Sequence, residues 1–295
     1  MTMYQFIRKE AQLFPVNLLC EVIGVSRSAY YSYVAGQSYQ PTNKKMDVTT
    51  RLISTFQEHK RRYGTRRLVK VFQKEGRSLS RYLASKILAD NGLKAIQPRS
   101  FVPRTTDSRH TLGFNPNLLL TAGLPIGPNK TWVSDITYIM LANGRWAYLA
   151  TWMDLWSRLI VGWHLDESME EDLIITAFRR AALGRQPTPG LIAHSDRGGQ
   201  YASKEFRKLL AKYNCRQSMS RADDPYDNAF AESYWSRLKA ELMEDGAFLS
   251  LDDARVEIGE YIDNYYNTIR LHSALGRAAF GYLSPVQFES QTKGE

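Results

Sequence analysis

Hydrophobic and polar residues follow two different spacings along the chain, and the change falls near residue 131. After that point, segments rich in β-branched and aromatic residues predict strands, with Asn143–Gly144 as a hairpin signal between the first two. Segments with helical spacing follow the third, fourth and fifth strands. The predicted strands are 131–140, 145–155, 158–165, 191–196 and 215–219, and the predicted helices are 168–183, 203–213 and 227–243. This order predicts an α/β fold in which a mixed five-stranded sheet carries helices on its faces.

Before this region the spacing is helical. Segments 13–24 and 25–34 predict two short helices around Gly24, with Ser26 as the N-cap of the second. Two helices joined by a glycine-containing turn are typical of a helix-turn-helix, although an ordinary helical hairpin has the same pattern. A further block of three short, basic helices ends at Asn91–Gly92.

Breaks in these patterns predict the domain boundaries. Residues 37–45 are interpreted as a linker, and the stretch 97–130 contains five prolines with little periodicity, which is typical of an extended connector. The predicted parts are a helix-turn-helix-like segment (1–40), a basic helical module (44–97), an extended linker (98–128), the sheet-containing core (129–247) and a helical tail (248–295).

Charge is divided unevenly between these parts. The chain of 295 residues has a net charge of +9. Residues 1–112 hold 20 Lys and Arg against 7 Asp and Glu, whereas residues 113–295 hold 19 against 23. A basic half joined to a mildly acidic half indicates an electrostatic arm beside a separate working domain, and nucleic acid is the polyanion that this charge favours.

The composition excludes several classes of protein. No run reaches the roughly 18 consecutive apolar residues of a membrane span, and the N-terminal segment lacks the apolar core of a signal peptide. Two cysteines and five scattered histidines do not suit a disulfide scaffold or a structural zinc site. We therefore expect a soluble cytoplasmic protein that does not contact membranes.

Three acidic residues occupy positions that stand out from their surroundings. Asp135 lies inside the first predicted strand, Asp196 ends the fourth, and Glu232 lies one turn into the last predicted helix. A carboxylate in an apolar strand is costly unless it is paired or bound to a metal. Hard cations such as Mg²⁺ bind carboxylates together with water and phosphate oxygens, and two such ions about 3.5–4 Å apart activate an attacking oxygen and stabilise a leaving one. The three carboxylates are therefore candidate ligands of a catalytic metal site.

Basic side chains mark candidate contacts with DNA phosphates. Arginines cluster around the Gly64 turn, where a helix begins, and another lies at the start of the second helix of the helix-turn-helix-like segment. A solvated charged surface has the same pattern. These candidates are Arg27, Arg61, Arg62, Arg66 and Arg67. Lys239 shares a helical face with Glu232 and is a further candidate, with a solvated lysine as the alternative.

The acids lie in motifs that together resemble one family. The segments WVSDITYI, HSDRGGQY and DNAFAESYWSRLKAE resemble the integrase core of DDE transposases, and the 35 residues between Asp196 and Glu232 match the D,D(35)E spacing shared with retroviral integrases. The tail YNTIRLHSALG and the basic segment HKRRYGTRRL resemble the second-reading-frame product of insertion-sequence transposases of the IS-three family. The resemblance covers nearly the whole chain.

This resemblance implies an RNase H-like fold, with Asp135, Asp196 and Glu232 as catalytic residues and metal ligands. It implies Mg²⁺-dependent DNA cleavage at transposon ends followed by strand transfer, with two Mg²⁺ ions for which Mn²⁺ can substitute. The implied partners are the terminal inverted repeats, the target DNA and a second copy of the chain, because two ends must be paired. The resemblance further implies a bacterial, nucleoid-associated protein, and an upstream reading frame whose product is a partner or fusion.

Other residues near the acids carry weaker signals. Asn228 lies one turn before the predicted catalytic glutamate and either orients it or caps the helix. His194 lies two residues before the second acid and either orients that acid or has a structural role. Asp154 also follows an apolar strand, but the family resemblance implies a structural role for it. Arg270 and His272 match a family motif whose role the sequence does not reveal.

Two other functions use some of the same features. An RNase H-like nuclease that only hydrolyses DNA would use the same acids, and a non-catalytic DNA-binding regulator would explain the basic half. The helical N-terminal segments favour the transposase, because a simple nuclease needs no site recognition, and the regulator leaves the acid spacing unexplained. A glycosidase with two carboxylates fits the charge poorly.

Overall fold

The computed structural model describes residues 2–36, 43–97, 113–221, 229–243, 246–276 and 281–292, and the side chains of 43–45 and 229–233 fall outside this description. The chain divides into two compact units, Met1–Glu58 and His59–Glu295. None of the helices in the described part of the chain has the length and hydrophobicity that a membrane span requires.

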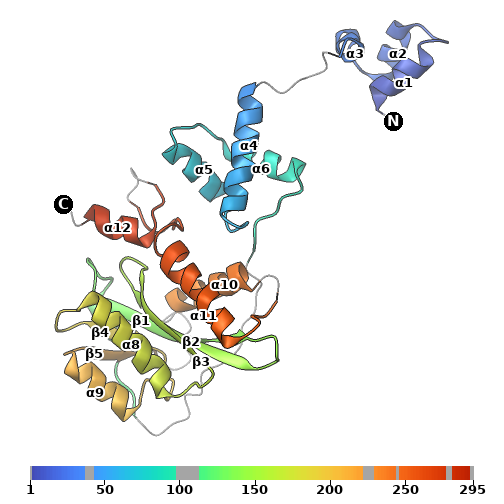
Figure 1. The fold of residues 1–295 in the computed structure, drawn as a ribbon. Coiled ribbons are helices and arrows are strands. Elements are labelled where there is room, and N and C mark those ends of the chain that lie inside the picture. The colour runs from blue at the N-terminus through green and yellow to red at the C-terminus, as the bar shows by residue number, and fades with distance from the viewer. Residues whose placement is uncertain are drawn as a thin grey trace. The chain divides into compact units, whose positions relative to one another are not determined.

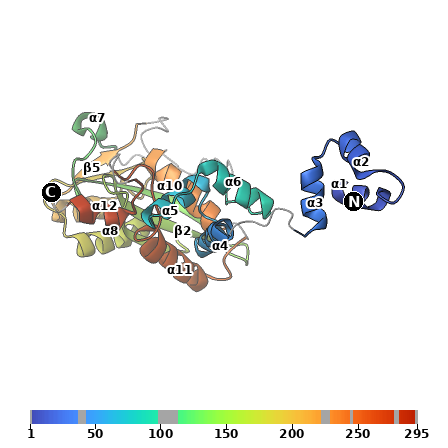
Figure 2. The same cartoon turned by 90° about the horizontal axis from the view of Figure 1, so that it is seen from above.

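The first unit is helical. Its elements are α1 (Met3–Glu10), α2 (Val16–Ile23), α3 (Arg27–Val34) and α4 (Asn43–Glu58). Helices α1, α2 and α3 lie together (Figures 1 and 2) around a small core of Ile7, Cys20 and Tyr30. The predicted pair of helices around a glycine turn is present as α2 and α3. Helix α1 was not predicted, and α4 begins at Asn43, inside the segment predicted as a linker.

The turn between α2 and α3 follows from its residues. Gly24 takes a left-handed backbone conformation (φ 74°), which glycine adopts without the strain that a Cβ causes. Ser26 then accepts a hydrogen bond from the Ala29 N–H (3.2 Å) and caps α3, as predicted.

The second unit contains the sheet and the helices that cover it. Its helices are α5 (Thr65–Lys74), α6 (Arg81–Asp90), α7 (Leu119–Ala122), α8 (Glu171–Arg185), α9 (Lys204–Lys212), α10 (Ala229–Leu242), α11 (Leu251–Gly259), the π-helix η2 (Glu260–Tyr266) and α12 (Pro285–Thr292). Its strands are β1 (Thr131–Met140), β2 (Trp146–Asp154), β3 (Ile160–Asp166), β4 (Ile192–Ser195) and β5 (Arg216–Met219). These strands form one mixed sheet in the order β3-β2-β1-β4-β5, which confirms the predicted sheet. Strands β1, β2 and β3 pair antiparallel, whereas β4 is parallel to both β1 and β5.

Helices cover both faces of this sheet. Helices α8 and α9 lie on one face, and α10 and α11 lie on the other (Figure 1). Side chains alternate between the faces along a strand, so Trp132 of β1 joins the core under α8 and α9, together with Trp152, Phe178 and Phe206. The neighbouring odd-numbered positions of β1 face α10, and Asp135 is one of them.

Helix α8 approaches β3 closely because Gly162 has no side chain. A Cβ at Gly162 would lie 2.5 Å from the carbonyl oxygen of Ala177 and 2.6 Å from the backbone nitrogen of Ala181. Both neighbours are backbone atoms of a buried helix, so the helix itself would have to move.

We therefore expect Gly162→Ala to lower the free energy of unfolding by about 1–3 kcal/mol, through overpacking. Gly184→Ala is the control, because Gly184 lies in α8 itself and a Cβ there meets no atom within 4 Å. Urea unfolding of both variants checks this, and equal stabilities would show that α8 tolerates the displacement.

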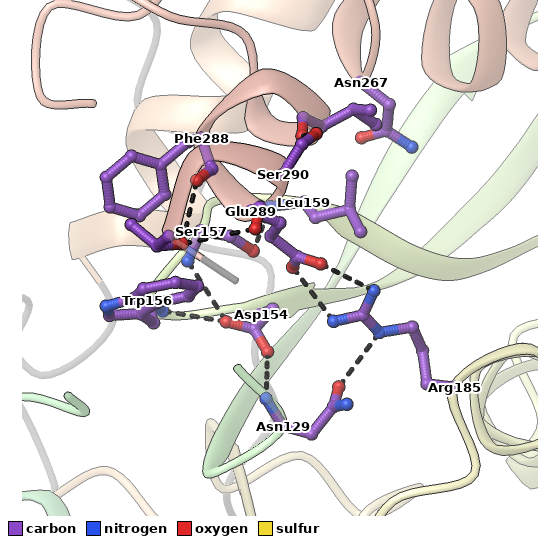
Figure 3. A network of polar contacts seen from close by, with 12 residues as sticks. Asn129, Asp154, Trp156, Ser157, Leu159, Arg185, Asn267, Phe288, Glu289 and Ser290 are labelled. Carbon is purple, nitrogen blue, oxygen red and sulfur yellow. Dashed lines mark hydrogen bonds and ion pairs between the residues drawn. The ribbon is translucent and has the colours of Figure 1, made fainter. Parts of the chain in front are cut away.

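The C-terminal helix is fixed to the core by a largely buried ion pair. Arg185 Nη1 lies 2.8 Å from Glu289 Oε2, and Arg185 Nη2 lies 2.9 Å from Glu289 Oε1. Arg185 Nε also donates to Asn129 Oδ1 (2.9 Å; Figure 3). This geometry is bidentate, which makes the pair directional, and it joins the end of α8 to α12.

The segment before α5 is attached to the chain beyond η2. Tyr63 accepts a hydrogen bond from the Leu271 N–H (2.8 Å) and donates to the Ile269 carbonyl (3.3 Å). Arg67 Nε donates to the Leu271 carbonyl (2.8 Å). These contacts join residues more than 200 positions apart, and they explain why α5 and α6 belong to the second unit. The boundary between the two units lies between Glu58 and His59, so it falls inside the predicted 44–97 module.

Candidate active site

Two of the three predicted acids lie at the same level of the sheet, one on β1 and one just after the neighbouring parallel strand β4. Val133 of β1 is the register partner of His194 in β4. Asp135 and Asp196 each lie two residues beyond this pair, Asp196 just after the end of β4. Because parallel strands run side by side in the same direction, this register places the two carboxylates beside each other.

Each of these carboxylates is held by N–H donors. Asp135 Oδ1 accepts from the backbone N–H of Ile136 (2.9 Å), and Oδ2 accepts from the indole N–H of Trp235 on α10 (3.1 Å). Asp196 Oδ1 accepts from the Gly198 N–H (3.0 Å), and a Cβ at Gly198 would lie only 3.1 Å from that oxygen. Both acids are half-buried, so they are oriented by the fold and still reachable from solvent.

The negative charges of Asp135 and Asp196 both act on the buried Tyr201. Tyr201 shares a hydrogen bond with Ser134 of β1 (2.8 Å). Burial raises the pKa of the Tyr201 hydroxyl well above its usual value, and the negative charges of Asp196 and Asp135 raise it further. The tyrosine therefore stays protonated and neutral within the electrostatic influence of both carboxylates.

Helix α10 presents one face to Asp135. Trp235 donates to this carboxylate, and Lys239 lies within its electrostatic reach: burial lowers the pKa of Lys239, while the charge of Asp135 opposes that shift. Position 232 precedes Trp235 by three residues and Lys239 by seven, so it belongs to the same helical face. The side chain of Glu232 and the whole of Asn228 lie outside the described residues.

The contact between Trp235 and Asp135 was not predicted from the sequence. Trp235 is indeed buried (6% exposed). A tryptophan one turn after a predicted catalytic acid is a weak signal, because its N–H needs a partner when buried, but its spacing along the helix does not tell which partner that is.

His194 joins two strands. Its ring is fully buried, with Nδ1 2.8 Å from Ser218 Oγ and Nε2 3.2 Å from Ser220 Oγ. Both ring nitrogens therefore contact hydroxyl groups, of Ser218 in β5 and of Ser220 just after it, while the two predicted roles of His194 stay predictions.

Asp154 has structural contacts. It is fully buried and accepts hydrogen bonds from the backbone N–H groups of Asn129 (2.6 Å), Trp156 (2.9 Å) and Ser157 (3.1 Å; Figure 3). Burial raises the pKa of the Asp154 carboxyl, and these three donors oppose the shift. The carboxylate thus organises the turn after β2, as the sequence indicated.

The predicted basic residues have different surroundings. Arg27, Arg61 and Arg66 are exposed. The Arg62 guanidinium lies over the rings of Tyr261 (5.0 Å) and Tyr265 (4.6 Å). Arg67 is bonded to the chain beyond η2, and burial lowers its pKa. Arg62 and Arg67 therefore make internal contacts, while phosphate contact stays a prediction for the whole set.

The structure gives Arg270 the role that the sequence left open. Arg270 is 1% exposed, and its Nε and Nη2 donate to Glu241 near the end of α10, at 3.0 and 2.5 Å. Tyr261 also donates to Glu241 (2.9 Å). Burial raises the pKa of Glu241, but the charge and hydrogen bonds of Arg270 outweigh it and the pKa is lowered. This buried pair attaches α10 to the tail.

His272 lies beside this pair and is held neutral. Its ring packs edge-on against Tyr266 (4.8 Å). Burial lowers the pKa of His272 well below its usual value, and nearby arginines, Arg270 first among them, lower it further.

Stability should therefore decrease in mild acid. Below a pH of about 6.5, His272 binds a proton in the unfolded chain but stays neutral in the folded chain. The free energy of unfolding therefore falls by up to about 1.4 kcal/mol per pH unit. His164, whose pKa burial also lowers, contributes in the same window. We expect His272→Phe to lose about 1 kcal/mol less of its unfolding free energy than the wild type between pH 7.5 and 5.5, measured by urea unfolding, and identical losses would contradict a neutral His272 in the folded chain.

The described residues contain no group of three or more potential metal ligands. This observation does not reach the predicted triad, because its third member, Glu232, has no described side chain.

Comparison with known families defines the class of protein. The integrase core domain family matches residues 126–225, and a second integrase core family matches residues 213–279. Together with the strand order and the two acids beside each other on β1 and after β4, these matches define an RNase H-like integrase core, the fold of a class of polynucleotidyl transferases.

Relatives that match over almost their whole length identify the particular family. The chain is 34% identical over 290 residues to transposase InsF for insertion sequence IS3A of Escherichia coli K12, which covers 98% of each chain. It is 36% identical over 276 residues to an uncharacterized 31 kDa protein of insertion element IS600 of Shigella sonnei, covering 92% of this chain and 98% of the relative. The chain belongs to the IS3 family of insertion-sequence transposases, which confirms the resemblance seen in its motifs.

Among solved structures, the HTLV-2 integrase catalytic core domain in complex with magnesium has a TM-score of 0.40 and 20% identity, covering 56% of this chain and 98% of that one. The family assignment rests on the sequence relatives.

Proposed function

We propose that this transposase cleaves DNA at the ends of its insertion sequence and joins the freed 3′-hydroxyl to a second strand, at a divalent-metal site formed by Asp135, Asp196 and Glu232. The observation that carries the proposal is the parallel register that brings Asp135 and Asp196 together, with the helix of Glu232 bonded to Asp135. Each acid comes from a different element, so the site exists only in the folded chain.

The donors present fit a hard divalent cation. Asp135 and Asp196 offer carboxylate oxygens, which Mg²⁺ and Mn²⁺ prefer, and two adjacent negative charges act together on Tyr201. Glu232 would complete the set from the face of α10 that Trp235 and Lys239 share. When bound there, one or two Mg²⁺ ions would supply Lewis-acid activation of water or of a 3′-hydroxyl and neutralise charge on the phosphate.

The protein's own groups position the substrate. Lys239 is within electrostatic reach of Asp135, and we propose that it contacts a DNA phosphate beside the cleaved bond. The exposed Arg27, Arg61 and Arg66 are proposed to bind phosphates of the terminal repeats. Two or more copies would hold the paired ends, in the bacterial cytoplasm at the nucleoid, with an upstream-frame product as partner or fusion.

The test uses end-labelled DNA that spans the terminal repeats flanking the gene, incubated with the protein and Mg²⁺. We expect both cleaved and strand-joined products. Cleavage without joining would favour the hydrolytic nuclease, and binding without either product would favour the DNA-binding regulator.

A further inference from the structure

The indole of Trp235 is held both by a hydrogen bond and by aromatic contacts. Its N–H donates to Asp135 Oδ2 at 3.1 Å. Its ring packs against Tyr234 (4.8 Å between ring centres), and Tyr234 packs edge-on against Tyr266 of η2 (4.9 Å). Tyr234 and Tyr266 thus form a chain of aromatic contacts that holds the Trp235 ring.

This contact joins the two elements that carry the first and third predicted acids. Trp235 lies one turn after Glu232 on α10, and Asp135 lies on β1. A helix that slides or rotates against a strand displaces all of its side chains together. A hydrogen bond at position 235 therefore also determines where position 232 lies relative to Asp135.

The hydrogen bonds on Asp135 also fix the plane of its carboxylate. Oδ1 is held by the Ile136 N–H and Oδ2 by the indole N–H. A carboxylate oriented in this way offers oxygens of the kind that hard divalent cations prefer. Partners of this kind orient a ligand and are worth roughly 10–100-fold in metal affinity or activity.

We propose that Trp235 is a positioning residue of the active site, which sets the carboxylate plane of Asp135 and the register of α10 so that Asp135 and Glu232 reach the same cation. The inference rests on the proposed function, because it assumes that Asp135 is a metal ligand.

The experiment measures Mn²⁺ binding to the DNA-free full chain by isothermal titration calorimetry. Trp235→Phe keeps an aromatic ring and removes the N–H, and we expect it to bind Mn²⁺ roughly 10-fold more weakly than the wild type. Trp163→Phe is the matched control, because Trp163 also donates its indole N–H to a carboxylate, that of Asp263 (3.3 Å), on another part of the sheet. The control should bind Mn²⁺ like the wild type.

A double-mutant cycle separates positioning from general damage. In an Asp135→Ala background, Trp235→Phe should cause little further loss of Mn²⁺ affinity, because both the ligand and the acceptor of the indole N–H are already gone. Thermal melts check folding. If Trp235→Phe does not fold, benzothienylalanine at position 235 replaces the N–H with sulfur and keeps the shape of the ring.

The outcomes distinguish this inference from the proposed function. Wild-type Mn²⁺ affinity in the Trp235 variant, or an equal loss in the Asp135→Ala background, would overturn the positioning role while leaving the metal site intact. Unchanged affinity in Asp135→Ala alone would instead overturn the proposed metal site.

Discussion

Replacing Asp196 by asparagine should lower both DNA cleavage and strand joining by at least roughly 10³-fold, and Asp135→Asn should do the same. A divalent metal held by these acids would supply several kcal/mol of transition-state stabilisation, and about 4 kcal/mol corresponds to a 10³-fold rate change. Asparagine keeps the shape of the side chain and one oxygen that can accept the Gly198 N–H, while the negative charge and the second carboxylate oxygen are lost. Binding of terminal-repeat DNA should persist.

Asp166→Asn is the matched control for these two variants. Asp166 ends β3 and accepts a hydrogen bond from the backbone N–H of the following residue (2.6 Å), as Asp135 does from Ile136. It differs in lying on the edge strand, away from β1 and β4. Gel assays of labelled ends should find normal products with this control. Substantial strand joining by Asp196→Asn, or an equal loss of products in the Asp166→Asn control, would show that the two acids do not belong to the catalytic centre.

Replacing Glu241 by alanine should lower the free energy of unfolding by about 3–5 kcal/mol. Glu241 accepts hydrogen bonds from Arg270 and Tyr261, and both members of its ion pair are more than nine-tenths buried. Removing the carboxylate leaves the Arg270 guanidinium buried without its opposite charge, and this is the costly way to break a buried pair. A Glu241→Leu and Arg270→Met double variant removes both charges and should be much less destabilised.

Glu167→Ala provides the comparison for an exposed pair. Glu167 lies 2.8 Å from Arg145 at the surface, and such pairs contribute about 0–1 kcal/mol. Urea unfolding of the three variants measures the difference. If Glu241→Ala lowers the free energy of unfolding by less than 1 kcal/mol, water reaches Arg270 and the pair of Glu241 and Arg270 does not fix α10 to the tail.

The sheet could be predicted from the sequence because its signals are local. The stretch Thr131–Met140 is a strand by composition, and Asn143–Gly144 predicts the turn that follows it. The two strand acids were also visible locally, because Asp135 and Asp196 interrupt apolar segments. Their proximity was implied by the family resemblance, and the parallel register of β1 and β4 supplies the physical reason.

The contacts that organise α10 could not be predicted in the same way. Trp235 bonds to a residue 100 positions earlier, and Arg67 bonds to one 204 positions later. Helical periodicity identifies the face on which a residue lies but not the element that meets this face. The arginines near Gly64 therefore all had the pattern of DNA contacts, although Arg62 and Arg67 pack against the chain's own tyrosines and carbonyl groups.

The central claim is that Asp135, Asp196 and Glu232 surround one metal site, and local radical cleavage tests it most directly. Fe²⁺ bound in place of Mg²⁺, with ascorbate and peroxide, generates hydroxyl radicals that cut the polypeptide close to the ion. We predict cuts near residues 135, 196 and 232, which excess Mg²⁺ suppresses and Asp196→Asn abolishes. Cuts near 135 and 196 without one near 232, or cuts unaffected by Asp196→Asn, would contradict a shared site.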